Sequence, residues 1–97
     1  MYFILTYQLV DNYIEKRTPY RPSHFELVKE FIATGELIMG GAFDDEEQAI
    51  LVFKVDDEAK IKAFTSRDPY VANGVVDSWA IRKWNMVTGD VIHDSLR

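Results

Sequence analysis

Apolar residues along this chain fall into short segments, some with the pattern of β-strands and others with helical spacing. The strand-like segments are rich in aromatic and β-branched residues. The acidic run Asp44 to Glu47 predicts a hairpin turn between two of them, and Asn73-Gly74 predicts a turn before the last. We therefore expect four strands, at residues 2–9, 36–43, 49–55 and 75–86.

Two segments between these strands are predicted to be helices, because their apolar residues recur three or four positions apart. In the first, Phe25, Val28, Phe31 and Ile32 recur at helical spacing with Leu27 beside them, and the helix is expected to end at Gly35, a residue common just beyond helix ends. The second is expected to be capped by Asp56 and to bury an inner stripe of Ala59, Ile61, Ala63 and Phe64.

The start of the first helix can be placed in two ways. Ser23 and Glu26 match a capping box, which would make Ser23 the N-cap. Alternatively, Arg21 is the N-cap and Pro22 occupies the first helical position. In either case His24 lies in the first turn of the helix.

The resulting order, β-α-β-β-α-β, is that of the ferredoxin-like fold, an α+β architecture with a four-stranded antiparallel sheet. Right-handed crossovers place both helices on one face of that sheet. We expect one domain over residues 1–97, with a polar connection at Asp11 to Arg21 and a C-terminal tail at 88–97. Because three strands are apolar on both faces, the uncovered face is expected to pair two copies as a homodimer, or as a higher oligomer built from it.

Composition narrows the classes of function. The net charge of −5 argues against a nucleic-acid partner, since phosphate backbones are bound by basic surfaces. No cysteine is present, which excludes disulfides and thiolate sites, and no apolar run is long enough to span a membrane. We therefore expect a cytoplasmic protein. His24 and His93 share no partners at ligand spacing, so neither a metal nor another cofactor is predicted.

One acid and one histidine are the candidates for chemistry. Asp68 precedes Pro69, which disfavours helical backbone at the residue before it, so the carboxylate is expected on a bend between two elements. If the fold brings Asp68 next to His24, they form an imidazole–carboxylate pair that can move a proton near neutral pH. Each has a simpler alternative: His24 as an exposed or capping residue, and Asp68 as a turn residue bonded to its own backbone.

Three further residues are candidates for contact with a small-molecule substrate. Arg21 could hold an anionic group, since guanidinium pairs bidentately with carboxylate. Arg17 could do the same, although a solvated loop charge explains it more simply. Tyr70 could line a pocket or pack on the sheet. Trp79 and Trp84 fall on opposite faces of the last strand and are expected in the core or in an interface.

Taken together and in this order, these residues resemble the YciI family, whose members have a YCII-related domain. The resemblance covers roughly residues 2–89 and rests on Arg17, Arg21, His24, Gly35, Gly40-Gly41, Asp68-Pro69-Tyr70, Asn73-Gly74 and a last strand ending at Trp84. One departure is that Gly41-Ala42 stands where the family commonly has Gly-Pro, which is expected to change the backbone beside the pocket.

The resemblance implies a dimeric α+β barrel whose His–Asp active site maps onto His24 and Asp68. It favours a small cofactor-free and metal-free enzyme that moves protons on a small anionic, lactone-like metabolite. In this hypothesis His24 transfers the proton, Asp68 orients the imidazole, and Arg21 holds the anion. Two alternatives stay open: a non-catalytic small-molecule-binding or interaction module, and a cofactor-independent monooxygenase.

Overall fold

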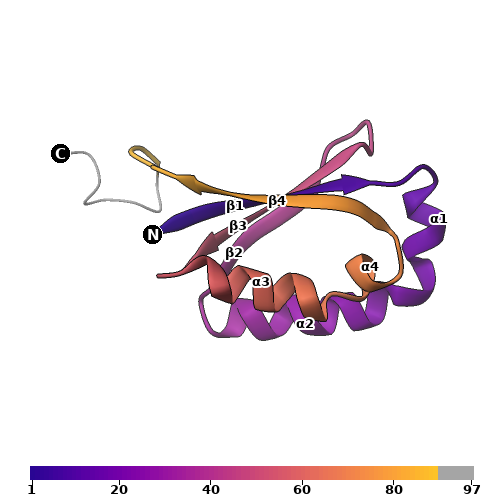
Figure 1. Cartoon of the computed structure of the whole chain (residues 1–97), viewed down its shortest axis with the longest axis horizontal. Helices are drawn as coiled ribbons and strands as arrows, with labels where there is room; N and C mark the ends of the chain where they lie inside the picture. The colour runs from indigo at the N-terminus through magenta and orange to yellow at the C-terminus, as the bar shows by residue number, and fades with distance from the viewer. Residues whose placement is uncertain (90–97) are drawn as a thin grey trace.

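The computed structural model describes residues 1–89, in which an antiparallel sheet carries helices on one face (Figure 1). The strands are β1 (Tyr2–Leu9), β2 (Leu37–Ala42), β3 (Gln48–Lys54) and β4 (Val76–Trp84). The helices are α1 (Tyr13–Arg17), α2 (Arg21–Ala33), α3 (Glu58–Arg67) and α4 (Pro69–Ala72), with a 3-10 turn η1 (Thr18–Tyr20) before α2. From residue 90 onward the predicted tail, with His93, lies outside the described residues.

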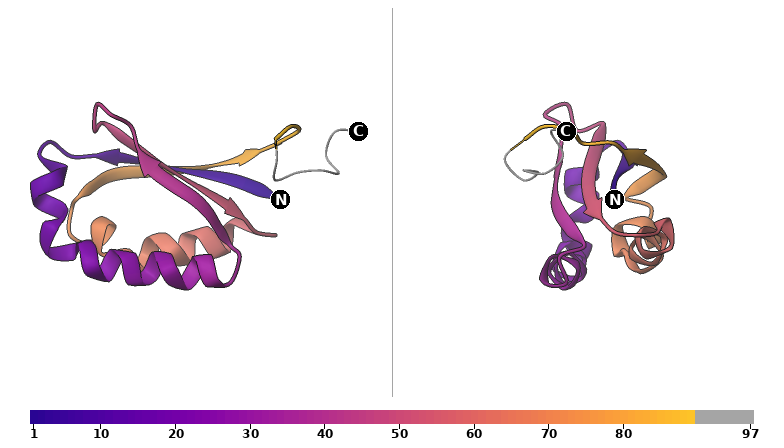
Figure 2. Two further views of the ribbon diagram at one scale, coloured as in Figure 1. Left: turned by 180° about the vertical axis from the view of Figure 1, so that it is seen from behind. Right: turned by 90° about the vertical axis from the view of Figure 1, so that its left-hand side faces the viewer.

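The order of the strands confirms the predicted fold class. They lie in the order β2-β3-β1-β4 and every neighbouring pair is antiparallel, which is the ferredoxin-like arrangement. As right-handed crossovers require, α2 and α3 lie side by side over the same face of the sheet (Figure 2). Within the described residues no helix is long and apolar enough to cross a lipid bilayer, and the cytoplasmic location stays a prediction.

The core lies between the sheet and these two helices. Along β1 the alternate residues Phe3, Leu5 and Tyr7 point inward and are buried. Three phenylalanines then join the sheet to both helices, with ring centroids 5.1 to 6.4 Å apart in edge-to-face contacts: Phe31 of α2, Phe53 of β3 and Phe64 of α3. This cluster fixes α2, and therefore any side chain it carries, against the sheet.

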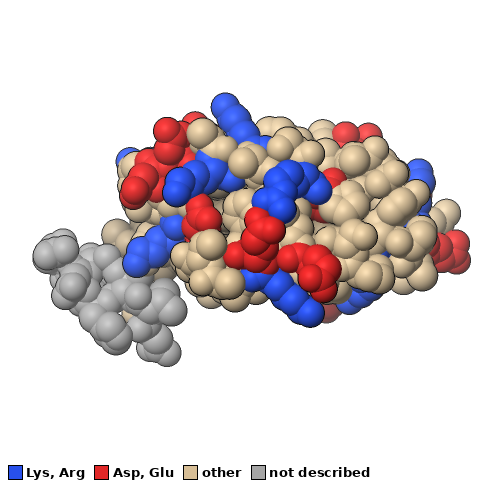
Figure 3. All heavy atoms as spheres, turned by 90° about the horizontal axis from the view of Figure 1, so that it is seen from below, with Lys and Arg blue, Asp and Glu red and all other residues tan. Residues whose placement is uncertain are grey.

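The outer surface of the helix layer is charged instead. Acidic and basic side chains are interspersed over it (Figure 3). Arg67 of α3 pairs bidentately with Glu30 of α2, with Nη2 2.8 Å from Oε1. Both side chains are about half exposed, so this pair is expected to contribute little to the stability of the fold.

The segment from Asp11 to Arg21 is mostly helical, not the polar connection that the sequence predicted. Tyr13 is the reason, because this residue is 6% exposed and anchors α1 to the core. A five-residue helix with one buried side chain has no detectable periodicity, so the hydrophobic pattern could not indicate it. The consequence for the site is that Arg17, at the end of α1, has a fixed position.

The start of α2 differs from both predicted versions. The helix begins at Arg21, with Pro22 in its first turn, and the capping box at Ser23 does not form. Tyr20 and Arg21 already have helical dihedral angles because η1 runs directly into α2, so Ser23 lies inside the helix instead of at its cap. His24 nevertheless falls at the end of the first turn, where either version placed it.

The second helix and the last strand also differ in detail from the prediction. Asp57, not Asp56, caps α3 by accepting a hydrogen bond from the backbone N–H of Ala59 at 2.7 Å. Ala59 and Ala63 are exposed, and the residues that follow helical spacing on the inner side are Ile61, Phe64 and Thr65. The strand predicted at 75–86 spans only Val76–Trp84.

The two tryptophans of β4 lie on opposite faces, as predicted, but neither is a core residue. Trp79 pairs with the inward-facing Tyr7, and Trp84 pairs with Tyr2 on the uncovered face. They are 38% and 42% exposed in the single chain. Their position on an edge strand, beyond the reach of the helices, accounts for this exposure.

Truncation of the aromatic cluster tests this description of the core. We expect Phe64→Ala to lower the free energy of unfolding by about 3–5 kcal/mol, because its side chain is fully buried. The control is Phe43→Ala, at a position 49% exposed, which should change it by less than about 1 kcal/mol. Urea unfolding at one protein concentration measures both, and equal losses would contradict the assignment.

Candidate functional site

Asp68 is a buried carboxylate at the junction of α3 and α4. Its backbone is extended (φ −74°, ψ 116°), as the residue before a proline prefers, so α3 ends there and α4 begins. Oδ1 accepts the backbone N–H of Tyr70 at 3.0 Å and lies 2.8 Å from Nδ1 of His24. Oδ2 accepts the hydroxyl of Tyr7 at 2.7 Å. The carboxylate is 0% exposed and has partners from three different elements.

The two readings of Asp68 that the sequence left as alternatives therefore occur together. The carboxylate caps the turn that follows it and also faces His24, forty-four residues away in the chain. A buried carboxylate costs several kcal/mol unless it is paired and hydrogen-bonded, which explains why its partners are so complete.

His24 is held by Asp68 on one side and is open to a cavity on the other. Because the carboxylate accepts from Nδ1–H, the hydrogen-bond network assigns the neutral ring a free lone pair on Nε2. The side chain is 11% exposed, and within residues 1–89 Nε2 has no hydrogen-bond partner. Tyr70 stacks on the imidazole with centroids 3.8 Å apart and planes 5° apart, which limits rotation of the ring.

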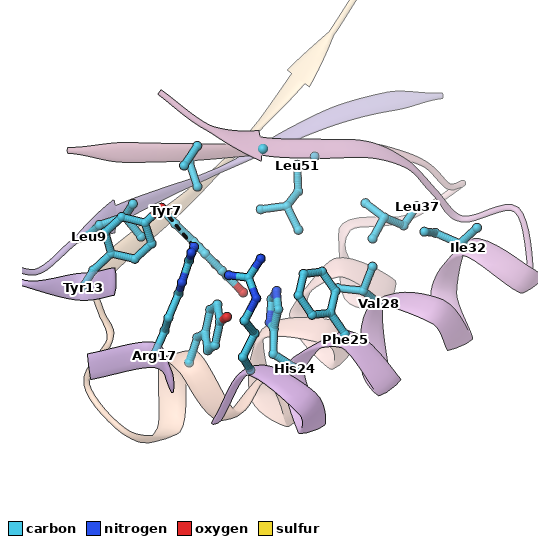
Figure 4. Close-up of a pocket in the computed structure, with 16 residues that line it drawn as sticks. Tyr7, Leu9, Tyr13, Arg17, His24, Phe25, Val28, Ile32, Leu37 and Leu51 are labelled. Atoms are coloured by element: carbon cyan, nitrogen blue, oxygen red, sulfur yellow. Dashed lines mark hydrogen bonds between the residues drawn. The ribbon is translucent and has the colours of Figure 1, made fainter. Parts of the chain in front are cut away.

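The cavity lies between α2 and the sheet and has a volume of about 330 Å³ (Figure 4). Its polar end is formed by Tyr7, Tyr13, Arg17, Arg21, His24 and Tyr70. The remainder of its wall is apolar and follows α2 toward β2. Among residues 1–89, no cluster of three or more histidine or acidic side chains is arranged to hold a metal ion.

Both predicted arginines lie at this polar end. Arg17 donates a hydrogen bond to the Tyr13 hydroxyl at 3.2 Å, and it is half-buried where a solvated loop charge was the simpler expectation. The guanidinium of Arg21 lies 4.8 Å from the ring centroid of Phe25. In the part of the chain that the structure describes, neither arginine pairs with a carboxylate. Two positive charges therefore face the cavity without a counter-ion from its walls.

Tyr70 lines the cavity as well as stacking on His24. Its hydroxyl is the one buried side-chain polar atom of the described residues that lacks a hydrogen-bond partner. Burial raises the pKa of Tyr70, although the charges of Arg21 and Arg17 oppose the shift. The phenol therefore keeps its proton near neutral pH and is a donor without an acceptor.

Tyr7 is a site residue that sequence analysis did not identify. Burial, and then the charge of Asp68, raise the pKa of its hydroxyl, so Tyr7 remains a hydrogen-bond donor to that carboxylate. The sequence held a signal, because a tyrosine in the inward alternation of β1 must bury its hydroxyl and a buried hydroxyl needs a partner. It could not indicate which residue that partner is.

Comparison with known proteins gives a family and a fold. The family model of the YCII-related domain matches residues 1–85. No curated protein matches the sequence closely enough to count as a relative. Among solved structures, the chain resembles 5-chloro-2-hydroxyhydroquinone dehydrochlorinase (TftG) from Burkholderia phenoliruptrix AC1100 in complex with 2,5-dihydroxybenzoquinone. The TM-score is 0.72 at 16% identity, over 87% of this chain and 93% of that chain.

Two structures of the protein Atu4242 from Agrobacterium tumefaciens are also similar, and one describes it as a NIPSNAP family protein with unknown function. Their TM-scores are both 0.54, at 15% and 18% identity. The matches cover 84% of this chain in each case, and 88% and 82% of the respective chains. At such low identity these similarities concern the fold, and they agree with the ferredoxin-like topology.

The bond between Tyr7 and Asp68 is testable by its effect on stability. We expect Tyr7→Phe to lower the free energy of unfolding at pH 7 by about 1–3 kcal/mol, because a buried carboxylate loses one of its partners. Tyr2→Phe, on the other face of the same strand, is the matched control and should have a smaller effect. Urea unfolding at a fixed protein concentration is the measurement, and equal effects would contradict the role of Tyr7.

The same variant has a defined pH dependence. Since the pKa of Tyr7 is raised by folding, this tyrosine stabilises the protein fully below the pKa of an unfolded tyrosine, about 10, and less as pH rises above it. The loss reaches at most about 1.4 kcal/mol per pH unit and is absent from Tyr7→Phe. The stability difference between the two proteins should therefore shrink between about pH 9 and 11. A constant difference would refute this assignment.

Proposed function

The chain belongs to the YCII-related domain family, and from this premise we propose that it is a cofactor-free acid–base enzyme for a small anionic organic molecule. One observation carries the proposal. Nε2 of His24, backed by the buried Asp68, faces a cavity that also contains two guanidinium groups without carboxylate partners among the described residues. A base beside fixed positive charges is the arrangement needed to remove a proton and stabilise the anion that forms.

In the proposed reaction the substrate oxygens bind to Arg21 and Arg17. Nε2 of His24 then removes a proton from the adjacent acidic C–H or O–H, and the electron pair moves toward the bound oxygen. The hydrogen bond from Nδ1–H to Asp68 holds the ring and stabilises the imidazolium. The proton returns from Nε2 to another atom in an isomerisation, or to a leaving group in an elimination.

The dehydrochlorinase gives limited support from analogy. It was solved with 2,5-dihydroxybenzoquinone, a small planar compound that is a vinylogous acid and therefore readily forms an anion. At 16% identity this similarity transfers no substrate to the present chain. The compound is useful as a coloured probe of the same chemical class.

We also propose that the chain forms a homodimer, or a larger assembly built from one, through the uncovered face of the sheet. Apolar side chains form a patch on this face beside polar ones such as Lys54 and Arg82. Two of the apolar side chains, Met39 and Trp84, are 53% and 42% exposed in the single chain. Monomeric proteins rarely expose large apolar patches. The large apolar residues on this face are Tyr2, Ile4, Met39, Ile50, Val52 and Trp84.

The catalytic proposal is tested by screening small organic acids, 2,5-dihydroxybenzoquinone among them, for binding and then for product. For any compound turned over, we expect His24→Gln to lower kcat/KM by roughly 10²–10⁴-fold, because the base is lost. Asp68→Asn should have a similar effect, since its amide favours the tautomer with hydrogen on Nε2.

Arg67→Gln is the control, because Arg67 lies on the outer surface of the helices and is about half exposed. It should leave turnover unchanged. A folded His24→Gln protein with full turnover would overturn the assignment of the base. Binding without product for every acid would favour the non-catalytic binding module.

The assembly is tested by sedimentation velocity at micromolar concentration. We expect the unmodified chain to sediment as a dimer or larger species and Ile4→Lys to sediment as a monomer, because the lysine would bury a charge in the interface. Ile14→Lys, on the exposed side of α1, is the control and should not change the assembly. A monomeric unmodified chain would show that the proposed interface is wrong.

A further inference from the structure

The cavity extends beyond the groups that proton transfer requires. Its floor is one side of α2, where Arg21, Phe25, Val28 and Ile32 recur at successive turns (Figure 4). Arg21 and Ile32 are eleven residues apart, and the rise of an α-helix makes this separation about 16 Å from the charged end of the cavity to its far end. Only the first of the four side chains is polar.

The wall opposite α2 is apolar and partly made of backbone. Leu37 and Leu51 face the cavity from β2 and β3. Gly40 pairs with Leu51 and so faces the same side of the sheet. A Cβ atom at Gly40 would lie 3.3 Å from Cγ of Leu51 and 3.4 Å from the carbonyl oxygen of Ile50. The neighbouring strand therefore approaches Gly40 closely, and the missing side chain keeps this wall open.

The far part of the cavity is unusual for a surface that binds only water. Phe25 and Ile32 are 39% and 52% exposed, although both lie on a helix that has a buried side available. Apolar side chains that line a concave surface together are a common mark of a ligand site.

We propose that the natural ligand is an organic acid with an extended apolar body, not a compact polar metabolite. Its carboxylate binds Arg21 and Arg17, and its hydrocarbon or aryl part lies along Phe25, Val28 and Ile32 under the open wall at Gly40. The inference rests on the proposed function only for the position of the anionic group. Beyond that function, it specifies the class of ligand and gives Ile32 and Gly40 the role of selecting ligands by their length.

Isothermal titration calorimetry with propanoate, butanoate, hexanoate and octanoate tests the proposal on the full chain. We expect affinity to rise with length, by up to about four-fold for each methylene that the cavity covers. Hexanamide, which has the same length but no charge, should bind at least roughly ten-fold more weakly than hexanoate. Arg21→Gln should remove most of that preference. Equal affinity along the series, or equal affinity for the acid and the amide, would overturn the proposal.

Two variants locate the apolar part of the ligand. Ile32→Ala, at an exposed position where folding is not at risk, should weaken octanoate several-fold and leave propanoate within two-fold. Gly40→Ala should also weaken octanoate more than propanoate, because the added methyl group narrows the cavity. Circular dichroism checks that this variant is folded. The control is Ile14→Ala, an exposed isoleucine outside the cavity. Equal loss for short and long acids in Ile32→Ala would contradict the proposed position.

Repeating the series with His24→Gln separates this inference from the proposed reaction. If the variant keeps the dependence on chain length and the unmodified protein turns over none of the acids screened, the enzyme is refuted and the ligand class is supported. If the unmodified protein turns over short acids and neither protein shows a dependence on length, the enzyme is supported and the ligand class is refuted.

Discussion

The arrangement of the site depends on the burial of one carboxylate. Asp68 is removed from water, and its oxygens are satisfied by Tyr7 from β1, His24 from α2 and the backbone of Tyr70 in α4. An unpartnered charge in that position would cost several kcal/mol, so each of these elements has one favourable position relative to the others. The hydrogen bond to the buried acid therefore orients the imidazole of His24. Because Tyr7 belongs to the core and donates to the same acid, the packing of the core also fixes the position of the site.

Much of the fold could be predicted because it follows from local patterns. Four apolar strands and two helices in a fixed order leave few topologies, and the observed strand order is that of the predicted fold class. Two features of the site were equally local. Pro69 fixed the backbone of Asp68, and the helix start placed His24 in a first turn; together with the family resemblance they made the pair a specific hypothesis.

Other features depend on contacts that no local pattern records. The bond from Tyr7 to Asp68 joins residues sixty-one positions apart. The short helix α1 exists because Tyr13 reaches the core, and without it the position of Arg17 beside the cavity could not be foreseen. The cap of α2 was misplaced for a related reason, since η1 continues into that helix and removes the need for Ser23 as a cap.

The alternation of β3 gives this small protein two surfaces from a single strand. Leu51 faces the cavity while its neighbours Ile50 and Val52 face the uncovered side. Substitutions at odd and even positions of the strand can therefore arise independently, one set changing the wall of the cavity and the other changing the uncovered face of the sheet. A single inserted residue would not respect this division, because it would exchange the two faces along the rest of the strand. Relatives should therefore vary in the chemistry of β3 far more readily than in its length.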